Sequence, residues 1–279
     1  MRCALLFLAL ASCAQSQVKV GVNAAARDIA FTATADQTEQ RYVILLPRQF
    51  DAGSTANLLI ALHGHGSDRW QFMTPSRDET RAALDIAAKH GLIYVAPDYR
   101  AKTSWMGPRA ESDLLQIIAD LKREYRVGKV FLCGGSMGGS SALTFTALHP
   151  DLIDGVVAMN ATANHLEYDN FQDAIAASFG GTKKTVPLEY KRRSAEYFPE
   201  RFTMPVAFTA CGEDKAVPPG SVMRLASALE KLNRKVLLIY RENEGHVTSY
   251  ADAIQAFEFI LAAAGASRDR VVPDAVPHR

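Results

Sequence analysis

The amino-acid sequence predicts an α/β fold, a mostly parallel β-sheet with helices on both of its faces. Short, fully apolar runs alternate along the chain with longer segments whose apolar residues recur at helical spacing. Glycine, proline and charged residues separate the two kinds of segment. Strands and helices that alternate in this way form parallel sheets, because each helix carries the chain back to the same end of the sheet.

Length and composition agree with one globular domain. The chain has 279 residues, of which 48% are hydrophobic and 22% charged, with a formal net charge of +1. This near-neutral balance gives no support to nucleic acid or an acidic polymer as a partner. No apolar run approaches the roughly 20 residues that a membrane-spanning helix needs.

The N-terminus has the layout of a secretory signal over residues 1–17. One positive charge and a short apolar stretch are followed by small and polar residues. The run 10–13, Leu-Ala-Ser-Cys, also resembles a bacterial lipobox, in which Cys13 becomes the lipidated first residue. A cut after Ala14 or Ser16 would instead release a soluble protein. We therefore expect an exported protein that is periplasmic, extracellular or attached to a membrane through Cys13.

The remaining chain is expected to form one domain over residues 18–264, with a small helical cap insertion at about 160–204 and a tail at 265–279. The apolar runs predict strands at 42–46, 57–62, 92–96, 130–133, 154–159, 205–211 and 235–240. Helical spacing predicts helices at 78–90, 111–125, 219–232 and 250–264, and another from about 137 to 148. Catalytic groups in parallel sheets gather at the carboxyl ends of the strands.

Ser136 stands at the centre of a G-x-S-x-G pattern within residues 134–139, Gly-Gly-Ser-Met-Gly-Gly. An apolar run precedes the pattern and a helical segment follows it. A sharp turn between a buried strand and a helix exposes such a serine at the top of the sheet, and only small neighbours fit around it. The pattern alone would also suit a glycine-rich turn with an incidental serine. The hypothesis that Ser136 is a nucleophile depends on the rest of the chain.

A serine nucleophile needs a histidine base that is oriented by a carboxylate, in the chain order Ser, Asp or Glu, His. His246 follows the strand at 235–240 and is the expected base. Asp214 follows the strand at 205–211 and is the expected acid. Other carboxylates near these positions are Glu213, Glu242 and Glu244, and other histidines after Ser136 are His149, His165 and His278.

Two backbone N–H groups should stabilise the oxyanion that forms during attack. The N–H of Met137, directly after the nucleophile, is one candidate. The second should come from the loop 63–66, His-Gly-His-Gly, where we expect the His65 N–H, with Gly66 next. Two histidines without a third ligand nearby are weak evidence for a metal. We expect neither a metal nor a cofactor.

Three further features have open or structural interpretations. Trp105 either lines a substrate pocket or packs in the interior. The aromatic residues of the insertion are expected to form a small core of their own. Cys133 and Cys211 end two strands that another strand should separate, so a disulfide between them is excluded by distance.

These motifs together resemble the α/β-hydrolase superfamily from about residue 42 to 264. The matching segments are Leu62-His63-Gly64-His65-Gly66, Gly134 to Gly139, Asp214 to Pro218 and Gly245-His246. Arg193 to Tyr197 and Phe202 to Pro205 resemble a segment of prolyl-oligopeptidase-like and bacterial esterase members, although Ala195 stands where they have proline. The resemblance implies a compact serine esterase similar to acetyl-xylan, feruloyl and dienelactone-type enzymes.

The sequence thus predicts an exported serine hydrolase that cleaves carboxylic esters through Ser136, His246 and Asp214 and an acyl-enzyme intermediate. Its expected partner is a small-molecule or oligosaccharide ester, including acylated carbohydrates. A serine peptidase of the prolyl-oligopeptidase type is the main alternative. A non-catalytic binding protein with this fold is the other.

Overall fold

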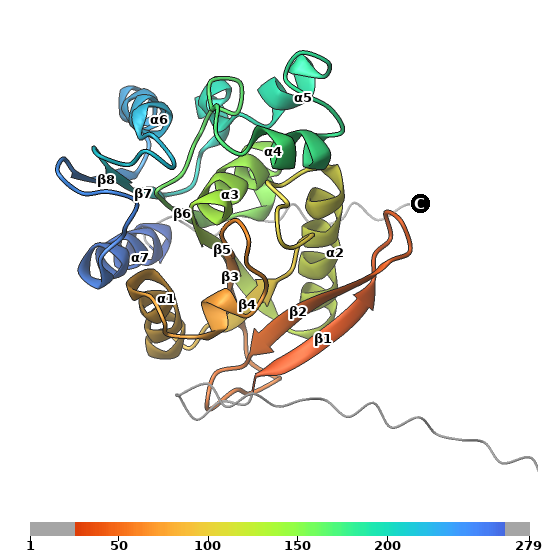
Figure 1. The fold of residues 1–279 in the computed structure, drawn as a ribbon. Coiled ribbons are helices and arrows are strands. Elements are labelled where there is room, and N and C mark those ends of the chain that lie inside the picture. Colours follow the sequence, from red (N-terminus) through yellow and green to blue (C-terminus); the bar gives the residue numbers. More distant parts are fainter. Residues whose placement is uncertain (1–25, 266–279) are drawn as a thin grey trace, which may run out of the picture.

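The computed structural model describes residues 26–265 and contains one eight-stranded sheet (Figure 1). The strand order is β1-β2-β4-β3-β5-β6-β7-β8, and from β4 to β8 all neighbouring strands are parallel. The strands are β1 (Arg27–Thr32), β2 (Glu39–Leu45), β3 (Ala56–Leu62), β4 (Ile93–Pro97), β5 (Val127–Gly135), β6 (Gly155–Met159), β7 (Val206–Cys211) and β8 (Val236–Arg241). The predicted α/β fold is confirmed.

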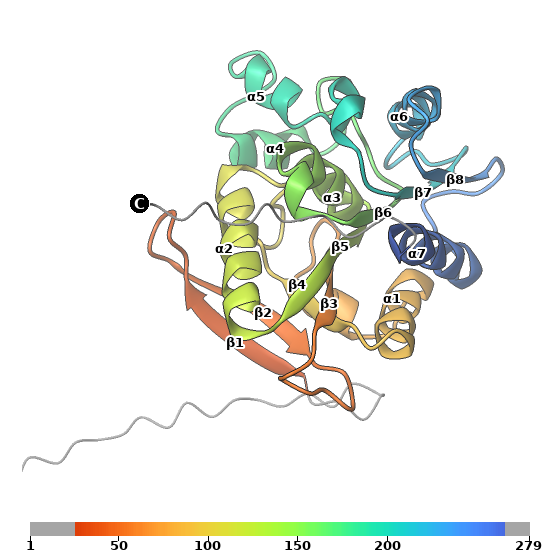
Figure 2. The same ribbon diagram turned by 180° about the vertical axis from the view of Figure 1, so that it is seen from behind.

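Helices cover both faces of the sheet, as expected. They are α1 (Asp78–Lys89), α2 (Pro108–Glu124), α3 (Met137–Leu148), α6 (Gly220–Lys231) and α7 (Tyr250–Gly265). Alternate strand residues face opposite layers, so the core has two parts. One part joins the sheet to α1 and α7, and the other joins it to α2, α3 and α6. Figure 2 shows α1 and α7 next to each other, as Figure 1 does from the other side.

The sheet begins with β1, before the strand predicted at 42–46, in a segment where the sequence has a strand-like alternation around Ile29 to Thr34. β1 and β2 form an antiparallel pair in which Arg27 lies opposite Ile44 and Thr32 opposite Glu39. β1 is an edge strand whose residues are exposed or half-buried. An edge strand of this kind needs no continuous apolar run, and its sequence Arg-Asp-Ile-Ala-Phe-Thr therefore gives only a weak signal.

The cap insertion lies over the carboxyl side of α3. It contains two short helices, α4 (Gln172–Phe179) and α5 (Pro187–Arg192), and two 3₁₀ turns, η3 (Ala195–Tyr197) and η4 (Pro199–Arg201). Its anchor is Arg193, whose side chain is fully buried. The guanidinium donates to Glu111 Oε2 at 2.7 Å, to Glu189 Oε1 at 2.5 Å and to the Met106 carbonyl at 2.6 Å. The bonds to Glu111 and Met106 join the cap to α2 and to the loop before it, and the bond to Glu189 lies within the cap.

Cys133 and Cys211 are both buried and unpaired. They lie on β5 and β7, which β6 separates. The prediction that they form no disulfide is confirmed. The predicted signal, Cys13 and the tail after residue 265 lie outside the described residues. Between residues 26 and 265, no helix is both long and apolar enough to cross a bilayer.

Candidate active site

The carboxyl ends of the parallel strands bring the predicted chemical groups to one edge of the sheet. Ser136 directly follows β5, Asp214 follows β7, and His246 follows β8. The loop that contains His65 follows β3, which is the neighbour of β5 on the other side. Residues that are far apart in sequence therefore meet above the middle of the sheet.

Ser136 occupies a sharp turn between β5 and α3. Its backbone has φ 58° and ψ −122°, a conformation that residues other than glycine seldom adopt. The Ser136 N–H donates to the Met159 carbonyl at 2.8 Å, which fixes the turn against β6. A Cβ atom on Gly134 would lie 2.3 Å from the Gly138 backbone, and one on Gly138 would lie 2.0 Å from the Leu62 carbonyl. Glycine is required at both positions because strand and helix approach so closely.

His246 and Asp214 form a short hydrogen bond, with 2.6 Å between His246 Nδ1 and Asp214 Oδ2. The Asp214 side chain is fully buried, whereas the His246 side chain is 32% exposed. Asp214 Oδ1 accepts the N–H groups of Ala216 at 2.9 Å and Val217 at 2.8 Å. The carboxylate is therefore held from both sides, and the imidazole keeps an exposed edge.

Hydrogen bonds keep Asp214 ionised. Burial alone would raise the pKa of its carboxyl group, but the hydrogen bond from His246 and those from Val217 N–H and Asn160 lower it below the ordinary value of 3.8. The alternative carboxylates Glu213, Glu242 and Glu244 are exposed to solvent. Within residues 26–265, Asp214 alone hydrogen-bonds to His246 through a carboxylate.

The loop after β3 lies beside the nucleophile turn. The Gly64 N–H donates to Gln71 Oε1 at 2.6 Å, and the Gly66 N–H donates to the Lys102 carbonyl at 2.8 Å. In the described part of the chain, the His65 N–H between them has no hydrogen-bond acceptor. The Met137 N–H is in the first turn of α3, where backbone N–H groups are unpaired and favour an anion. Both predicted oxyanion donors are therefore free to bind a ligand.

The histidine side chains of the loop support its structure. His63 is buried, with Nδ1 2.8 Å from the Gly64 carbonyl and Nε2 3.0 Å from the Asp98 carbonyl. His65 Nδ1 accepts the indole N–H of Trp105 at 3.2 Å, which makes Trp105 a packing residue beneath the loop. No cluster of three or more histidine, cysteine or acidic side chains suited to a metal is present among residues 26–265.

A cavity of about 580 Å³ opens above these groups. Its wall includes Ser136, His246 and His65, and also Phe171 from the cap. The Phe171 ring is 40% exposed, and its centroid lies 4.3 Å from that of His65. Phe171 was expected to belong to a small core within the cap. That prediction is wrong, since Phe171 lines the cavity, and Tyr168, Phe179 and Tyr190 are buried in the core that the sheet shares with α2, α3 and α6. A phenylalanine within a loop gives no sequence signal that separates these two roles.

Asn160 was not among the predicted site residues. It directly follows β6 and lines the same cavity. Its side-chain amide lies 3.4 Å from Asp214 Oδ2. Its position after a buried strand could have indicated a functional role, because the loops after β3, β5, β7 and β8 each carry a predicted functional residue.

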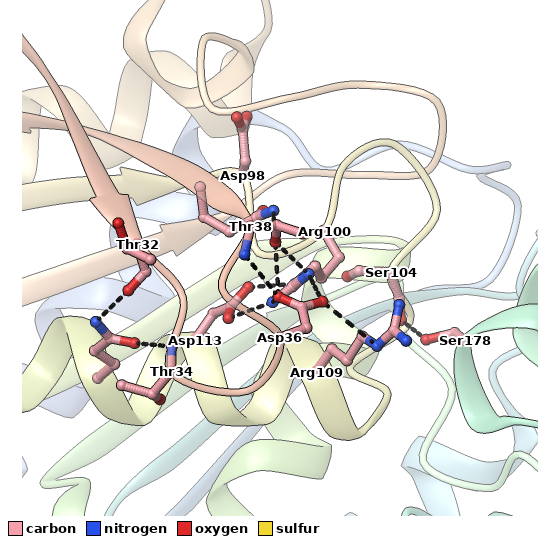
Figure 3. Close-up of polar contacts among 12 residues, drawn as sticks. Thr32, Thr34, Asp36, Thr38, Asp98, Arg100, Ser104, Arg109, Asp113 and Ser178 are labelled. Carbon is pink, nitrogen blue, oxygen red and sulfur yellow. Dashed lines mark hydrogen bonds and ion pairs between the residues drawn. The ribbon is translucent and has the colours of Figure 1, made fainter.

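Other polar side chains near the cap, including the alternative histidines His149 and His165, hydrogen-bond to groups outside the candidate active site. Arg100 is held between Asp36 and Asp113, at 2.7 Å and 2.5 Å, and the Ser178 hydroxyl nearby donates to the Ser104 carbonyl (Figure 3). His149 Nε2 lies 2.8 Å from Glu111 Oε1 at the end of α3. His165 is buried between the cap and α3, 3.2 Å from the Thr144 hydroxyl, and burial lowers its pKa to about 3.

Comparison of the sequence with models of known protein families finds a match. The model described as "Prolyl oligopeptidase family" matches residues 79–262, which cover the nucleophile turn, the acid and the base. The chain belongs to the prolyl oligopeptidase family. It is therefore a member of a serine hydrolase family, as predicted. A comparison with curated protein sequences finds no significant match.

Solved structures share the fold at low sequence identity. A putative dipeptidyl aminopeptidase IV from Bacteroides ovatus has a TM-score of 0.67 at 16% identity, over 87% of this chain but only 36% of that one. An S-formylglutathione hydrolase from Agrobacterium tumefaciens has a TM-score of 0.65 at 14% identity, over 90% of this chain and 98% of that one. The fluorophosphonate-binding serine hydrolase FphF from Staphylococcus aureus has a TM-score of 0.64 at 17% identity, over 86% and 98%. The chain thus spans little more than a third of the peptidase and nearly all of the two smaller hydrolases.

Proposed function

We propose that this protein hydrolyses carboxylic esters, with Ser136 as nucleophile, His246 as general base and acid, and Asp214 as the carboxylate that orients the imidazole. One observation carries the proposal. A half-buried serine in a strained turn and a histidine bonded to a buried carboxylate line the same cavity. A binding protein has no need for a strained serine or for a buried carboxylate behind a histidine.

In the first step Ser136 Oγ attacks the acyl carbonyl while His246 Nε2 accepts the proton of the Ser136 hydroxyl. Asp214 holds Nδ1–H, which fixes the tautomer and stabilises the imidazolium. The N–H groups of His65 and Met137 stabilise the oxyanion. His246 then gives its proton to the leaving alkoxide, and the acyl group remains on Ser136. A water molecule that His246 deprotonates releases the acid and restores the serine.

Two observations favour ester over peptide substrates. The cavity, at about 580 Å³, suits a small acyl group and part of its alcohol, including an acylated sugar. The fold is also shared by an S-formylglutathione hydrolase, which shows that a hydrolase of an acylated small molecule can be built on it. Peptide hydrolysis is the second candidate, and membership of the prolyl oligopeptidase family favours it.

The first experiment tests for a reactive serine. A fluorophosphonate probe should label the folded protein, and Ser136→Ala should abolish labelling. Ser141→Ala is a matched control, since this buried serine lies on α3, five positions after Ser136, and does not line the cavity. A wild-type protein that stays unlabelled would indicate a binding protein instead of an enzyme.

The second experiment separates the two substrate classes. Turnover of p-nitrophenyl esters and of acetylated and feruloylated sugars is compared with turnover of aminoacyl arylamides. We expect kcat/KM for an ester to exceed that for every arylamide. Robust arylamide turnover without any preference for esters would establish the peptidase instead.

We further propose that the protein is exported, on the grounds of its N-terminal sequence. The mass of the mature N-terminus distinguishes the two forms that the sequence allows. A diacylglyceryl-modified Cys13 would show a lipoprotein, and a free N-terminus after residue 14 or 16 would show a soluble protein. An unprocessed Met1 in the purified protein would contradict export.

A further inference from the structure

Asn160 has an unusual backbone conformation at the point where β6 reaches the active-site edge. Its φ is 47°, in the left-handed region, and its side chain is almost fully buried. The Asn160 N–H donates to the Thr209 carbonyl at 2.9 Å, which continues the ladder between β6 and β7. Asparagine tolerates this conformation better than most residues, so a turn role alone would explain its backbone. A role in the turn does not explain the hydrogen bonds that the Asn160 side chain makes.

The amide of the Asn160 side chain contacts Thr248, Thr209 and Asp214, and it also meets the thiol of Cys211. Its Oδ1 accepts the Thr248 hydroxyl at 2.7 Å, and the Thr209 hydroxyl oxygen lies 3.2 Å away. The two hydroxyl oxygens lie 2.7 Å apart. Its Nδ2 points to Asp214 Oδ2 at 3.4 Å. The two hydroxyls have one proton each, so one donates to Asn160 Oδ1 and the other to the neighbouring hydroxyl. This donor on the carbonyl side turns the NH₂ side of the amide toward the carboxylate.

This network links the elements that carry the acid and the base. Thr209 is on β7, which leads to Asp214, and Thr248 lies two residues after His246. All three network side chains are buried. The two loops are also joined by backbone, since the Glu213 N–H donates to the Glu244 carbonyl at 3.0 Å.

The carboxylate of Asp214 has few ways to turn. Oδ1 accepts two backbone N–H groups, while Oδ2 accepts His246 Nδ1 and faces the Asn160 amide. Without the amide, Oδ2 would have one donor only, and that donor is the partly exposed imidazole itself. A carboxylate in place of the amide would repel Asp214.

We propose that Asn160 is a positioning residue, which with Thr248 holds Asp214 in the orientation that His246 needs. This inference rests on the proposed roles of Asp214 and His246. It predicts that Asn160 acts on catalysis through Asp214 and makes no contribution to binding the ester.

Asn160→Gly is the most direct variant, because glycine adopts a positive φ without strain and only the amide is lost. We expect kcat for a p-nitrophenyl ester to fall about tenfold to a hundredfold, as when a hydrogen bond to a charged group is lost, with KM changed less than about twofold. Asn233→Gly is the matched control, since Asn233 has φ 53° on the exposed turn after α6. It should leave kcat unchanged.

Thr248 provides an independent test that keeps the Asn160 backbone intact. Thr248→Val removes the hydroxyl at nearly constant volume and should lower kcat about fivefold to tenfold. Thr248→Ser keeps the hydroxyl and should restore most of the activity. A buried threonine that contributed only to packing would give the opposite ranking, because valine fills the space better than serine.

A double-mutant cycle decides the route of the effect. In an Asp214→Ala background, Asn160→Gly should change the remaining rate of fluorophosphonate labelling less than about twofold. An equal loss with and without Asp214, or a raised KM at unchanged kcat, would overturn the proposal. These outcomes differ from failure of the proposed function, in which Ser136→Ala would retain labelling.

Discussion

The active-site edge of the sheet and the cap above it are built in different ways. At the edge, short loops follow buried parallel strands, and backbone hydrogen bonds set the positions of Ser136 and Asp214. In the cap, α4 and α5 are short, and side chains fix them to the rest of the protein. Arg193 reaches Glu111 on α2, and Asn170 donates to the Ala216 carbonyl.

This difference separates the reaction from the choice of substrate. The edge depends on strand register, which few substitutions can change without unfolding the sheet. The cap depends on individual ion pairs and contributes Phe171 to the cavity wall. We therefore expect changes at the edge to lower kcat, changes in the cap's anchors to lower stability, and changes in its lining to alter KM.

The largest effect is expected at the edge. Asp214→Ala should lower kcat for a p-nitrophenyl ester by about 10⁴-fold, because the imidazole loses its orientation and its partner charge. Glu213→Ala, at the exposed neighbouring residue, should leave kcat within about twofold. Full activity in Asp214→Ala, with a loss in Glu213→Ala or Glu242→Ala, would assign the acid to another carboxylate.

The next effect concerns the anchor of the cap. Arg193→Met leaves Glu111 and Glu189 without their buried partner and should lower the free energy of unfolding by about 3–5 kcal/mol, measured by urea denaturation. Arg192→Met is the matched control. Arg192 contacts the same two carboxylates at 3.3 Å and 3.6 Å, but its side chain is half exposed, so we expect a loss of less than about 1 kcal/mol. Equal losses in the two variants would show that burial of the ion pair is unimportant.

A smaller effect follows from the charge of Glu111. Burial raises the pKa of its carboxyl group, but His149, Arg193 and Arg192 outweigh burial and lower it to about 2. A pKa that folding lowers gives stability that is complete above the ordinary value of 4.5 and is lost as the pH falls toward 2. Glu111→Gln should therefore flatten the fall in Tm between these two pH values.

The control for this measurement is Glu230→Gln, a change at an exposed carboxylate on α6. Its Tm should follow the wild-type curve. A Glu111→Gln variant with the full acid-induced fall in Tm would show that other carboxylates cause it.

The smallest effect is expected from the lining of the cap. Phe171→Ala removes an exposed ring from the cavity wall and should raise KM for a bulky acyl ester up to about tenfold, with kcat nearly unchanged. Leu188→Ala, on the exposed surface of α5 and outside the cavity, should change neither constant. A fall in kcat without a change in KM would assign Phe171 to the chemistry of the edge.

The same difference explains what could be predicted from the sequence. The strand before Ser136 and the apolar runs before Asp214 and His246 each carry a local signal, because a buried parallel strand must be apolar along its whole length. The order of these signals along the chain then predicts which groups meet. The short hydrogen bond between His246 and Asp214 agrees with that order.

Other features depend on contacts between distant residues and could not be predicted. Arg193 looks like a surface charge in sequence, and only the fold brings Glu111 to it, 82 positions away. Asn160 is held by Thr209 and Thr248, and neither a motif nor periodicity in the sequence connects these two residues to it. Trp105 could not be assigned to the substrate pocket or to the interior, because the sequence does not show on which side of the loop after β3 its indole lies.

The strand order also has a consequence for how the protein can be made. Neighbouring strands are about 4.8 Å apart, so Cys133 on β5 and Cys211 on β7, with β6 between them, cannot approach to bonding distance. Residues 26–265 contain no other cysteine. Their refolding from denaturant requires neither an oxidant nor a disulfide isomerase. The domain should reach the same yield in reducing and oxidising buffers, and in a bacterial cytoplasm as well as after export.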